Sequence, residues 1–221
     1  PYIALARASG VTSTIRLGTG ITLVPQRHPM ILAKEVAALD FHSGGRFIFG
    51  IGTGWLREEV EMFGADFPRR WTQTREALDA MKAVWTNEIG EFHGKYYDIP
   101  PVRVFPKPAQ KPYPPIVIGG AAKRVMERIV QHANGWLPNR VTPEDLKGHR
   151  AELDRLATEA GRDPKTIRIH VYGQEPDRAL AEALTAAGAD EVIIRPRHVE
   201  TEAEMDGQLQ EIAAKLIDRD R

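Results

Sequence analysis

The stretch that decides the fold is residues 47–55, FIFGIGTGW, in which a short apolar run passes directly into glycines. An apolar, β-branched and aromatic run bounded by glycine is typical of a buried β-strand. Gly52, Thr53 and Gly54 would then form a turn at the carboxyl end of that strand, with exposed amides and one small hydroxyl. Parallel α/β proteins place their ligands at such ends. The stretch therefore predicts a parallel sheet and a candidate binding turn.

The same turn argues against a Rossmann-type dinucleotide site. Gly52 and Gly54 match two glycines of the G-x-G-x-x-G pattern, but the third glycine is missing. That pattern needs all three glycines for the tight turn, the close approach of the pyrophosphate and the packing of helix on strand. A different use of the turn is expected.

Short apolar runs alternate with amphipathic segments along the whole chain. The predicted strands are residues 15–24, 47–51, 116–118, 135–137, 167–172 and 192–194. Apolar residues recur at helical spacing in 78–85, 125–133 and 205–217. Such alternation implies right-handed βαβ units and a parallel sheet. A count of about six units fits either a doubly wound sheet or most of an eight-fold barrel.

Composition excludes several classes of function. The 221 residues carry 30 Lys and Arg against 30 Asp and Glu, which removes the sequence-wide argument for a nucleic acid or membrane partner. The absence of cysteine excludes disulfides, thiolate metal sites and cysteine nucleophiles. The seven histidines show no metal-ligand spacing, so no metal site is predicted. No apolar stretch approaches the roughly 18 residues of a membrane span. The sequence indicates a soluble, cytoplasmic protein.

Two further glycine-containing stretches are candidate sites. Residues 17–22, LGTGIT, place two glycines inside a predicted strand, which indicates a bulge, a close approach of backbone to a ligand, or a tight contact between helix and strand. Residues 118–122, IGGAA, take a strand end straight into a helix, where free amides and the helix dipole would bind an anion. Lys123 and Arg124 would lie in the first turn of that helix, either facing a bound phosphate or as solvated surface charge.

Taken together, several ordered motifs resemble the luciferase-like monooxygenase superfamily over about residues 1–171. The motifs are LGTGI at 17–21, RHP at 27–29, SGGRF at 43–47, GIGTGW at 50–55, PKP at 106–108, PPIVIGG at 114–120 and GWLP at 135–138. Their form is most similar to the branch that uses the deazaflavin coenzyme F-420.

The resemblance implies an α/β fold, a (β/α)8 TIM-barrel formed as one domain by residues 1–221. Residues 1–11 would be its second helix, 15–24 its third strand, 47–51 its fourth and 116–118 its fifth. The segment of about residues 91–115 would be the insertion that follows the fourth strand and helix in this family. On this alignment the first two βα units are missing from this numbering, and we expect them to precede residue 1.

The resemblance also implies roles for particular positions. A non-proline cis peptide that supports the flavin-type ring is expected within 19–21, and the turns after the fourth and fifth strands match those that cradle the ribityl and phosphate groups. A general rule for barrels places phosphate after the seventh and eighth strands instead, but the glycines favour these two turns. The predicted cofactor-binding residues are Thr19, Gly20, Ile21, Gly52, Thr53, Gly54, Gly119, Gly120 and Ala121.

No catalytic residue is assigned, because the acid–base groups of this family usually lie near the ends of its first two strands. The implied function is hydride transfer between coenzyme F-420 and a small-molecule substrate. An FMN-dependent monooxygenase is the alternative, and a non-catalytic flavin-binding or cofactor-less member is an alternative of another class. Trp55 stands where some sugar-phosphate dehydrogenases of the family have an acidic residue, which disfavours that substrate. A second copy of the chain, forming a homodimer, is the other expected partner.

Overall fold

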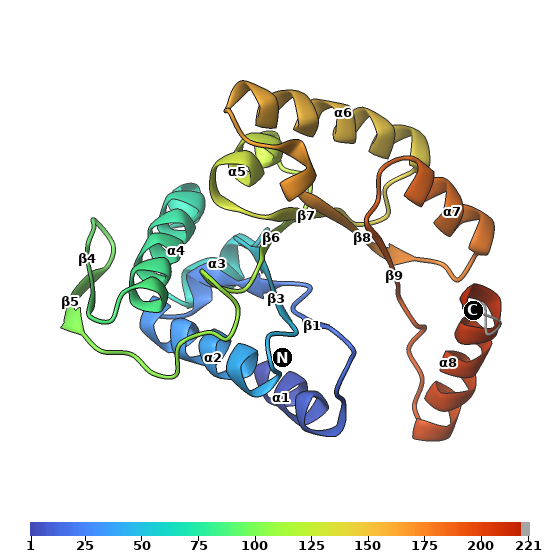
Figure 1. Cartoon of the computed structure of the whole chain (residues 1–221), viewed down its shortest axis with the longest axis horizontal. Helices are drawn as coiled ribbons and strands as arrows, with labels where there is room; N and C mark the ends of the chain where they lie inside the picture. Colours follow the sequence, from blue (N-terminus) through green and yellow to red (C-terminus); the bar gives the residue numbers. More distant parts are fainter. Residues whose placement is uncertain (218–221) are drawn as a thin grey trace. The chain divides into compact units, whose positions relative to one another are not determined.

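The computed structural model describes residues 1–217, which form two compact units, Pro1–Val117 and Ile118 onward. Both units are built from strands and helices in alternation, as Figure 1 shows. Parallel pairing joins β1 (Leu17–Gly18) and β2 (Thr22–Leu23) to β3 (Phe47–Gly52). It also joins β7 (Gly135–Leu137) and β9 (Glu191–Ile194) to β8 (Arg168–Gln174). The predicted parallel α/β class is therefore confirmed.

In the first unit the strand order is β1-β3-β6, and β2 also pairs with β3. Phe47, Phe49 and Ile51 of β3 are fully buried and form the centre of its core with Leu32 and Met81. The elements of this unit are α1 (Tyr2–Val11), β1 (Leu17–Gly18), β2 (Thr22–Leu23), η1 (Val24–Gln26), α2 (Pro29–His42), β3 (Phe47–Gly52), α3 (Arg57–Met62), η2 (Phe67–Arg69), α4 (Arg70–Thr86), β4 (Gly90–His93) and β5 (Asp98–Val102). Strand β6 (Ile116–Gly119) begins in this unit.

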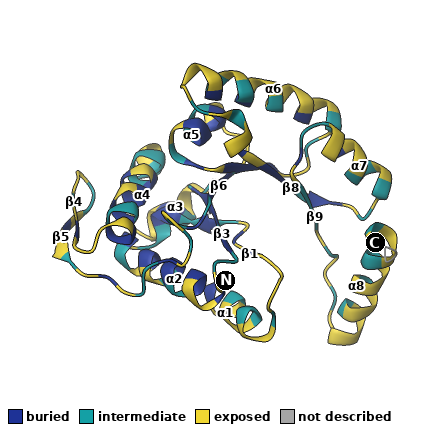
Figure 2. Cartoon of the chain, in the orientation of Figure 1, coloured by how far each residue is buried: buried dark blue, intermediate teal, exposed yellow. Residues whose placement is uncertain are grey.

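In the second unit the order is β6-β7-β8-β9. Figure 2 shows dark, buried positions along β8, whereas α8 has no buried residue. The elements are α5 (Val125–His132), β7 (Gly135–Leu137), α6 (Pro143–Glu159), η3 (Pro164–Thr166), β8 (Arg168–Gln174), α7 (Arg178–Ala186), β9 (Glu191–Ile194) and α8 (Glu202–Leu216). Within the described residues, no helix is both long and apolar enough to span a membrane.

The predicted strand over residues 15–24 is wrong as a continuous element. It is interrupted at residues 19–21, so that only Leu17–Gly18 and Thr22–Leu23 pair with β3. The backbone N–H of Thr19 still donates to the carbonyl oxygen of Ile48 in β3 at 3.3 Å, and its Oγ1 donates to the carbonyl oxygen of Gly50 at 2.7 Å. The peptide bond between Gly20 and Ile21 is cis, within the segment where the family resemblance implies such a bond.

The predicted entry of residues 118–122 into a helix is also wrong. Strand β6 ends at Gly119 and helix α5 begins only at Val125. Gly120 has a φ of +91°, a conformation that turns the chain away from both strand and helix. Lys123 and Arg124 therefore lie in a turn ahead of the helix and not in its first turn.

The predicted insertion of about residues 91–115 holds most of the antiparallel hairpin β4–β5, which begins at Gly90, and no helix. Two buried carboxylates of the first unit hold it. Glu76 accepts from the backbone N–H of Tyr97 at 2.8 Å, and Asp40 accepts from the backbone N–H of Gln110 at 2.9 Å and from its side-chain amide at 2.6 Å. Since Asp40 is fully buried, these bonds satisfy a charge that would otherwise be costly.

Candidate functional site

The first group of predicted site residues is assembled where β3 ends. Strand β2 pairs with the last two residues of β3, so that Thr22 lies opposite Ile51 and Leu23 opposite Gly52. Thr19 is only 6% exposed, whereas Gly20 beside it is exposed. The structure therefore brings residues 19–21 against the residues that lead into the 52–54 turn.

This close approach depends on glycines in β3. A Cβ atom on Gly50 would lie 1.8 Å from the carbonyl oxygen of Thr19, and one on Gly52 would lie 2.0 Å from Cδ1 of Ile21. Both distances are far inside van der Waals contact. A side chain at Gly50 must displace the backbone of Thr19, whereas one at Gly52 must displace the end of the Ile21 side chain. The structure contains a tight contact of this stretch with strand β3 and not with a helix, and the close approach of backbone to a ligand stays a prediction.

The turn formed by Gly52, Thr53 and Gly54 is held from the side by Arg70. The Nε–H of Arg70 donates to the carbonyl oxygen of Gly54 at 2.9 Å, and its guanidinium group lies 3.9 Å from the ring centre of Phe67. Thr53 is partly exposed and the following Trp55 is 83% exposed. The turn thus offers backbone, one hydroxyl and an aromatic ring at the carboxyl end of a parallel strand.

Behind β2, the hydroxyl of Tyr2 contacts Thr22. Their oxygens are 2.9 Å apart, and burial raises the pKa of Tyr2 well above its usual value. Tyr2 is therefore a neutral phenol at any physiological pH. This contact ties helix α1 to the strand that follows the irregular segment, and so it helps to position residues 19–21.

The second group of predicted site residues, Gly119, Gly120 and Ala121, forms an open turn of the second unit. Gly120 donates its N–H to the carbonyl oxygen of Leu137 at 3.2 Å and accepts from the indole N–H of Trp136 at 2.8 Å. A Cβ on Gly120 would meet nothing within 4 Å. In contrast to the turn at β3, this one faces open space.

A run of backbone N–H groups follows Gly120. Among residues 1–217, the amides of residues 121–124 donate no hydrogen bond to another protein group. Residues 121–124 are also exposed, so these amides can reach a ligand. Successive free N–H groups after a strand make a concave anion site of the kind found in phosphate-binding loops. The amides that can bind an anion thus lie after Gly120 in a turn, and not at the start of a helix as the sequence predicted.

The basic side chains near these turns differ in whether they already pair with an acidic side chain. Arg57 forms an ion pair with Glu61 at 2.7 Å within α3, and Arg124 lies 4.0 Å from Glu127. All these groups are at least one-third exposed, so each pair contributes little to stability. Lys123 has no ion-pair partner in the part of the chain that the structure describes.

Sequence reasoning missed two polar features of the second unit. Buried His170 of β8 lies 2.5 Å, from Nδ1 to Oε2, from Glu191 at the neighbouring position of β9. A hollow lined by Arg195 and Arg197 lies beyond the same two strands. Both combine residues from separate elements, so no local spacing marks them. The one sequence signal was the Arg-Pro-Arg run directly after the predicted strand 192–194.

No group of three or more His, Asp or Glu side chains suited to a metal ion occurs within residues 1–217. Solvent-accessible backbone, hydroxyls and arginines dominate the candidate sites instead. Such groups fit an organic, oxyanion-bearing ligand better than a metal ion.

Comparisons with known proteins agree with this architecture. The chain is 39% identical over 176 residues to the uncharacterized protein Rv0953c of Mycobacterium tuberculosis, covering 77% of this chain and 61% of that protein. It is 26% identical over 175 residues to an FMNH2-dependent dimethylsulfone monooxygenase of Pseudomonas putida, covering 74% and 47%. The chain thus spans about three-fifths or less of the length of these curated relatives.

A solved structure shows the same fold. The coenzyme F420-dependent tetrahydromethanopterin reductase of Methanopyrus kandleri superposes with a TM-score of 0.67 and 27% identity, over 80% of this chain and 56% of that one. The predicted fold is therefore confirmed as the α/β fold of luciferase-like barrels, of which the chain covers part. The model of the luciferase-like monooxygenase family matches residues 1–218. The chain belongs to the luciferase-like monooxygenase family.

Proposed function

We propose that this protein is an F-420-dependent oxidoreductase that acts on a small organic molecule. The observation that carries the proposal is the packing of residues 19–21 against the glycine end of β3. Because Gly50 and Gly52 admit that segment so closely, exposed Gly20 presents main chain at the strand end. A flat ring system can lie on main chain where side chains would hold it off.

The residues present fit such a cofactor. Residues 19–21 would support its ring, and Thr53 would offer a hydroxyl from the 52–54 turn. The free amides after Gly120 would bind its phosphate, with Lys123 beside them. When bound, a deazaflavin supplies two-electron hydride chemistry, and the protein supplies binding and orientation.

The choice of F-420 over FMN rests on the form of the GTGW and SGGR motifs and on similarity to the M. kandleri reductase, whose name states that it is F420-dependent. The FMN-dependent monooxygenase remains the second candidate. It is favoured by similarity to the P. putida enzyme, whose name states dependence on FMNH2. The two cofactors share an isoalloxazine-like ring and a phosphate, so the turns described above would accept either.

Titration of the protein with F-420 and with FMN, followed by absorbance, tests the proposal. We expect saturable binding of F-420 that is tighter than binding of FMN. Tighter FMN binding together with oxygen consumption by the reduced complex would establish the monooxygenase. Binding of neither cofactor would support the non-catalytic class.

A further inference from the structure

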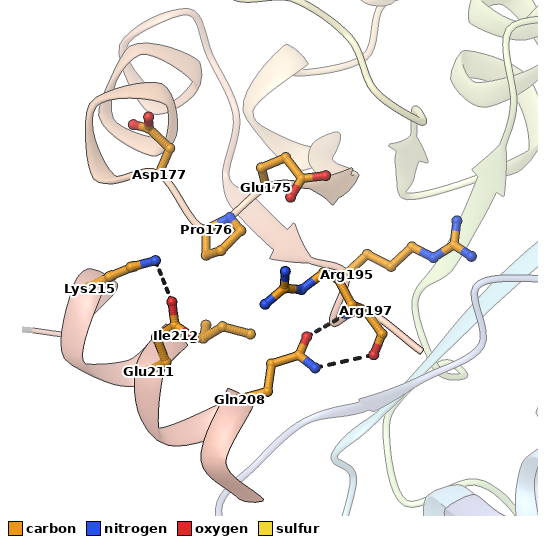
Figure 3. A pocket seen from close by; sticks show the side chains of 9 residues that line it. All are labelled: Glu175, Pro176, Asp177, Arg195, Arg197, Gln208, Glu211, Ile212 and Lys215. Carbon is orange, nitrogen blue, oxygen red and sulfur yellow. Dashed lines mark hydrogen bonds and ion pairs between the residues drawn. The ribbon is translucent and has the colours of Figure 1, made fainter. Parts of the chain in front are cut away.

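A second candidate site lies in the second unit, at the carboxyl ends of β8 and β9. It is a hollow of about 370 Å³ between the turn after β8, the segment after β9 and helix α8 (Figure 3). We propose that this hollow binds the phosphate or carboxylate group of a small-molecule ligand through the guanidinium groups of Arg195 and Arg197. The proposed cofactor turns do not include these residues, and the proposal holds for either cofactor.

The hollow is lined by equal numbers of basic and acidic side chains, but these differ in whether they are free to contact a ligand. Its charged lining residues are Arg195, Arg197, Lys215, Glu175, Asp177 and Glu211. Glu211 accepts from the ammonium group of Lys215 at 2.7 Å, which together with the nearby Arg197 lowers the pKa of Glu211. Asp177 caps helix α7 by accepting from the backbone N–H of Leu180 at 2.9 Å. Two of the three acids are therefore already engaged.

Unlike these two acids, the two arginines keep their charged groups available to a ligand. Within residues 1–217, neither guanidinium group forms an ion pair or a hydrogen bond with another side chain. A guanidinium group offers a planar fork of donors that matches the two oxygens of a carboxylate or phosphate. Figure 3 shows the two guanidinium groups pointing in different directions from one segment, so each offers its own fork to an oxyanion.

The backbone that carries the arginines is fixed in place. Arg195 extends the pairing of β9 with β8, since its N–H donates to the carbonyl oxygen of Gln174 at 3.2 Å. Gln208 of α8 then holds Arg197 on both sides: its Oε1 accepts from the backbone N–H at 2.5 Å, and its Nε2 donates to the backbone carbonyl at 3.3 Å (Figure 3). With the backbone fixed, only the two side chains remain to be ordered when an anion binds, which lowers the entropic cost.

Helix α8 supplies a whole face to the hollow. Glu211, Ile212 and Lys215 lie three, four and seven residues after Gln208, which is the spacing of one helix face, and all four residues line the hollow. A complete capping box, in which Thr201 and Glu204 satisfy each other's backbone groups, starts this helix. Local contacts therefore stabilise the start of this helix.

The location agrees with a general property of parallel α/β proteins. Their ligands bind beyond the carboxyl ends of the strands, and barrels frequently bind phosphate after their last two strands. The hollow is larger than a single phosphate ion requires, so a ligand with an organic part attached to the anion fits it. Of the three lining acids, the described contacts leave Glu175 alone unengaged. A cationic ligand would therefore find a single free carboxylate, and it is disfavoured.

Inorganic phosphate and acetate, titrated into the whole chain at low salt and followed by backbone and side-chain amide resonances, test the proposal. We expect the amides of Arg195, Arg197 and Gln208 to shift together and to saturate. The double variant Arg195→Ala with Arg197→Ala should weaken binding about tenfold or more. The phosphate and acetate titrations distinguish the two ligand classes.

Three matched variants sharpen the test. Lys147→Ala with Arg155→Ala removes the same charge from exposed positions of α6 and should leave affinity within about twofold of the parent. Arg195→Lys with Arg197→Lys keeps the charge but removes the planar fork, so its affinity should fall between parent and double alanine variant. Glu175→Gln removes a like charge and should tighten binding.

Several outcomes would overturn the proposal: unchanged affinity in the double alanine variant, equal weakening in the α6 control, or no saturable shift at Arg195, Arg197 and Gln208. Shifts confined to residues 119–124 would contradict this site while supporting the phosphate contact of the proposed function. The two proposals therefore fail separately.

Discussion

The two glycine turns look alike in sequence but differ in what their glycines do. At the end of β3, Gly50 and Gly52 leave no room for a Cβ, because residues 19–21 pack directly on them. At the end of β6, Gly120 faces open space and is required by its φ of +91°. In the first case a glycine allows another segment to pack closely on the strand. In the second it allows the chain to change direction just before a run of free amides. Substitution should expose this difference, since the first turn should lose stability and the second should lose ligand.

The largest effect is expected at Gly50. Gly50→Ala forces a methyl group to within 1.8 Å of the Thr19 carbonyl oxygen, so residues 19–21 must move and the Thr19–Gly50 hydrogen bond must break. We expect a loss of about 3 kcal/mol or more in the free energy of unfolding, measured by urea denaturation.

Gly18→Ala is the matched control, because its Cβ would make only ordinary contacts from 3.5 Å. Its unfolding free energy should change by less than about 1 kcal/mol. Equal stability of the two variants would show that residues 19–21 do not pack on β3 as described.

At the second turn the effect should fall on binding. Gly120→Asp places a carboxylate beside the free amides, and its charge repels a bound phosphate. Gly120→Ala carries the same backbone strain at positive φ without the charge. We expect both variants to lose similar stability, while the aspartate variant binds F-420 about tenfold or more weakly than the alanine variant. Equal cofactor affinity of the two variants at low salt would remove this turn from the site.

The sequence could predict the features that depend on neighbouring residues, but not those that depend on residues far apart in the chain. The strand predicted at 47–51 depends on neighbouring residues, and the structure contains it as β3. The break at residues 19–21 depends on Gly50, which lies about thirty positions away, so the local pattern predicted a continuous strand. The glycine pattern in turn marked both turns as candidate sites, and their cofactor contacts stay predictions.

The late start of α5 has a similar cause. Ala121 and Ala122 are good helix formers, but the conformation of Gly120 and its bonds to Leu137 and Trp136 direct the chain outward first. The arginine hollow brings together three segments between Glu175 and Lys215. Apart from the Arg-Pro-Arg run at 195–197, no single segment marks it.

The cations near the two turns should have a smaller and salt-dependent influence. Replacing Arg57, Lys123 and Arg124 together by Ala should raise the dissociation constant for F-420 about tenfold at low salt, because exposed contacts are each worth about 0.2–1 kcal/mol. FMN, which lacks the carboxylate tail of F-420, should be affected less. Since Arg57 already pairs with Glu61, the double variant at Lys123 and Arg124 should reproduce most of the effect. A loss that persists at high salt would point to a structural cause.

A further effect concerns the hydroxyl of Thr19, which holds the irregular segment of the first unit. Thr19→Val keeps the shape of the side chain but removes the donor to the Gly50 carbonyl oxygen, leaving a buried acceptor without that bond. We expect a loss of about 1–2 kcal/mol in the free energy of unfolding, and Thr19→Ser should retain most of the stability because it keeps the donor. If the ring of the cofactor lies on residues 19–21, the valine variant should also bind F-420 more weakly, whereas binding at the free amides after Gly120 should be unaffected. A valine variant as stable as the parent, with the serine variant less stable, would show that methyl packing and not the hydrogen bond holds the segment against β3.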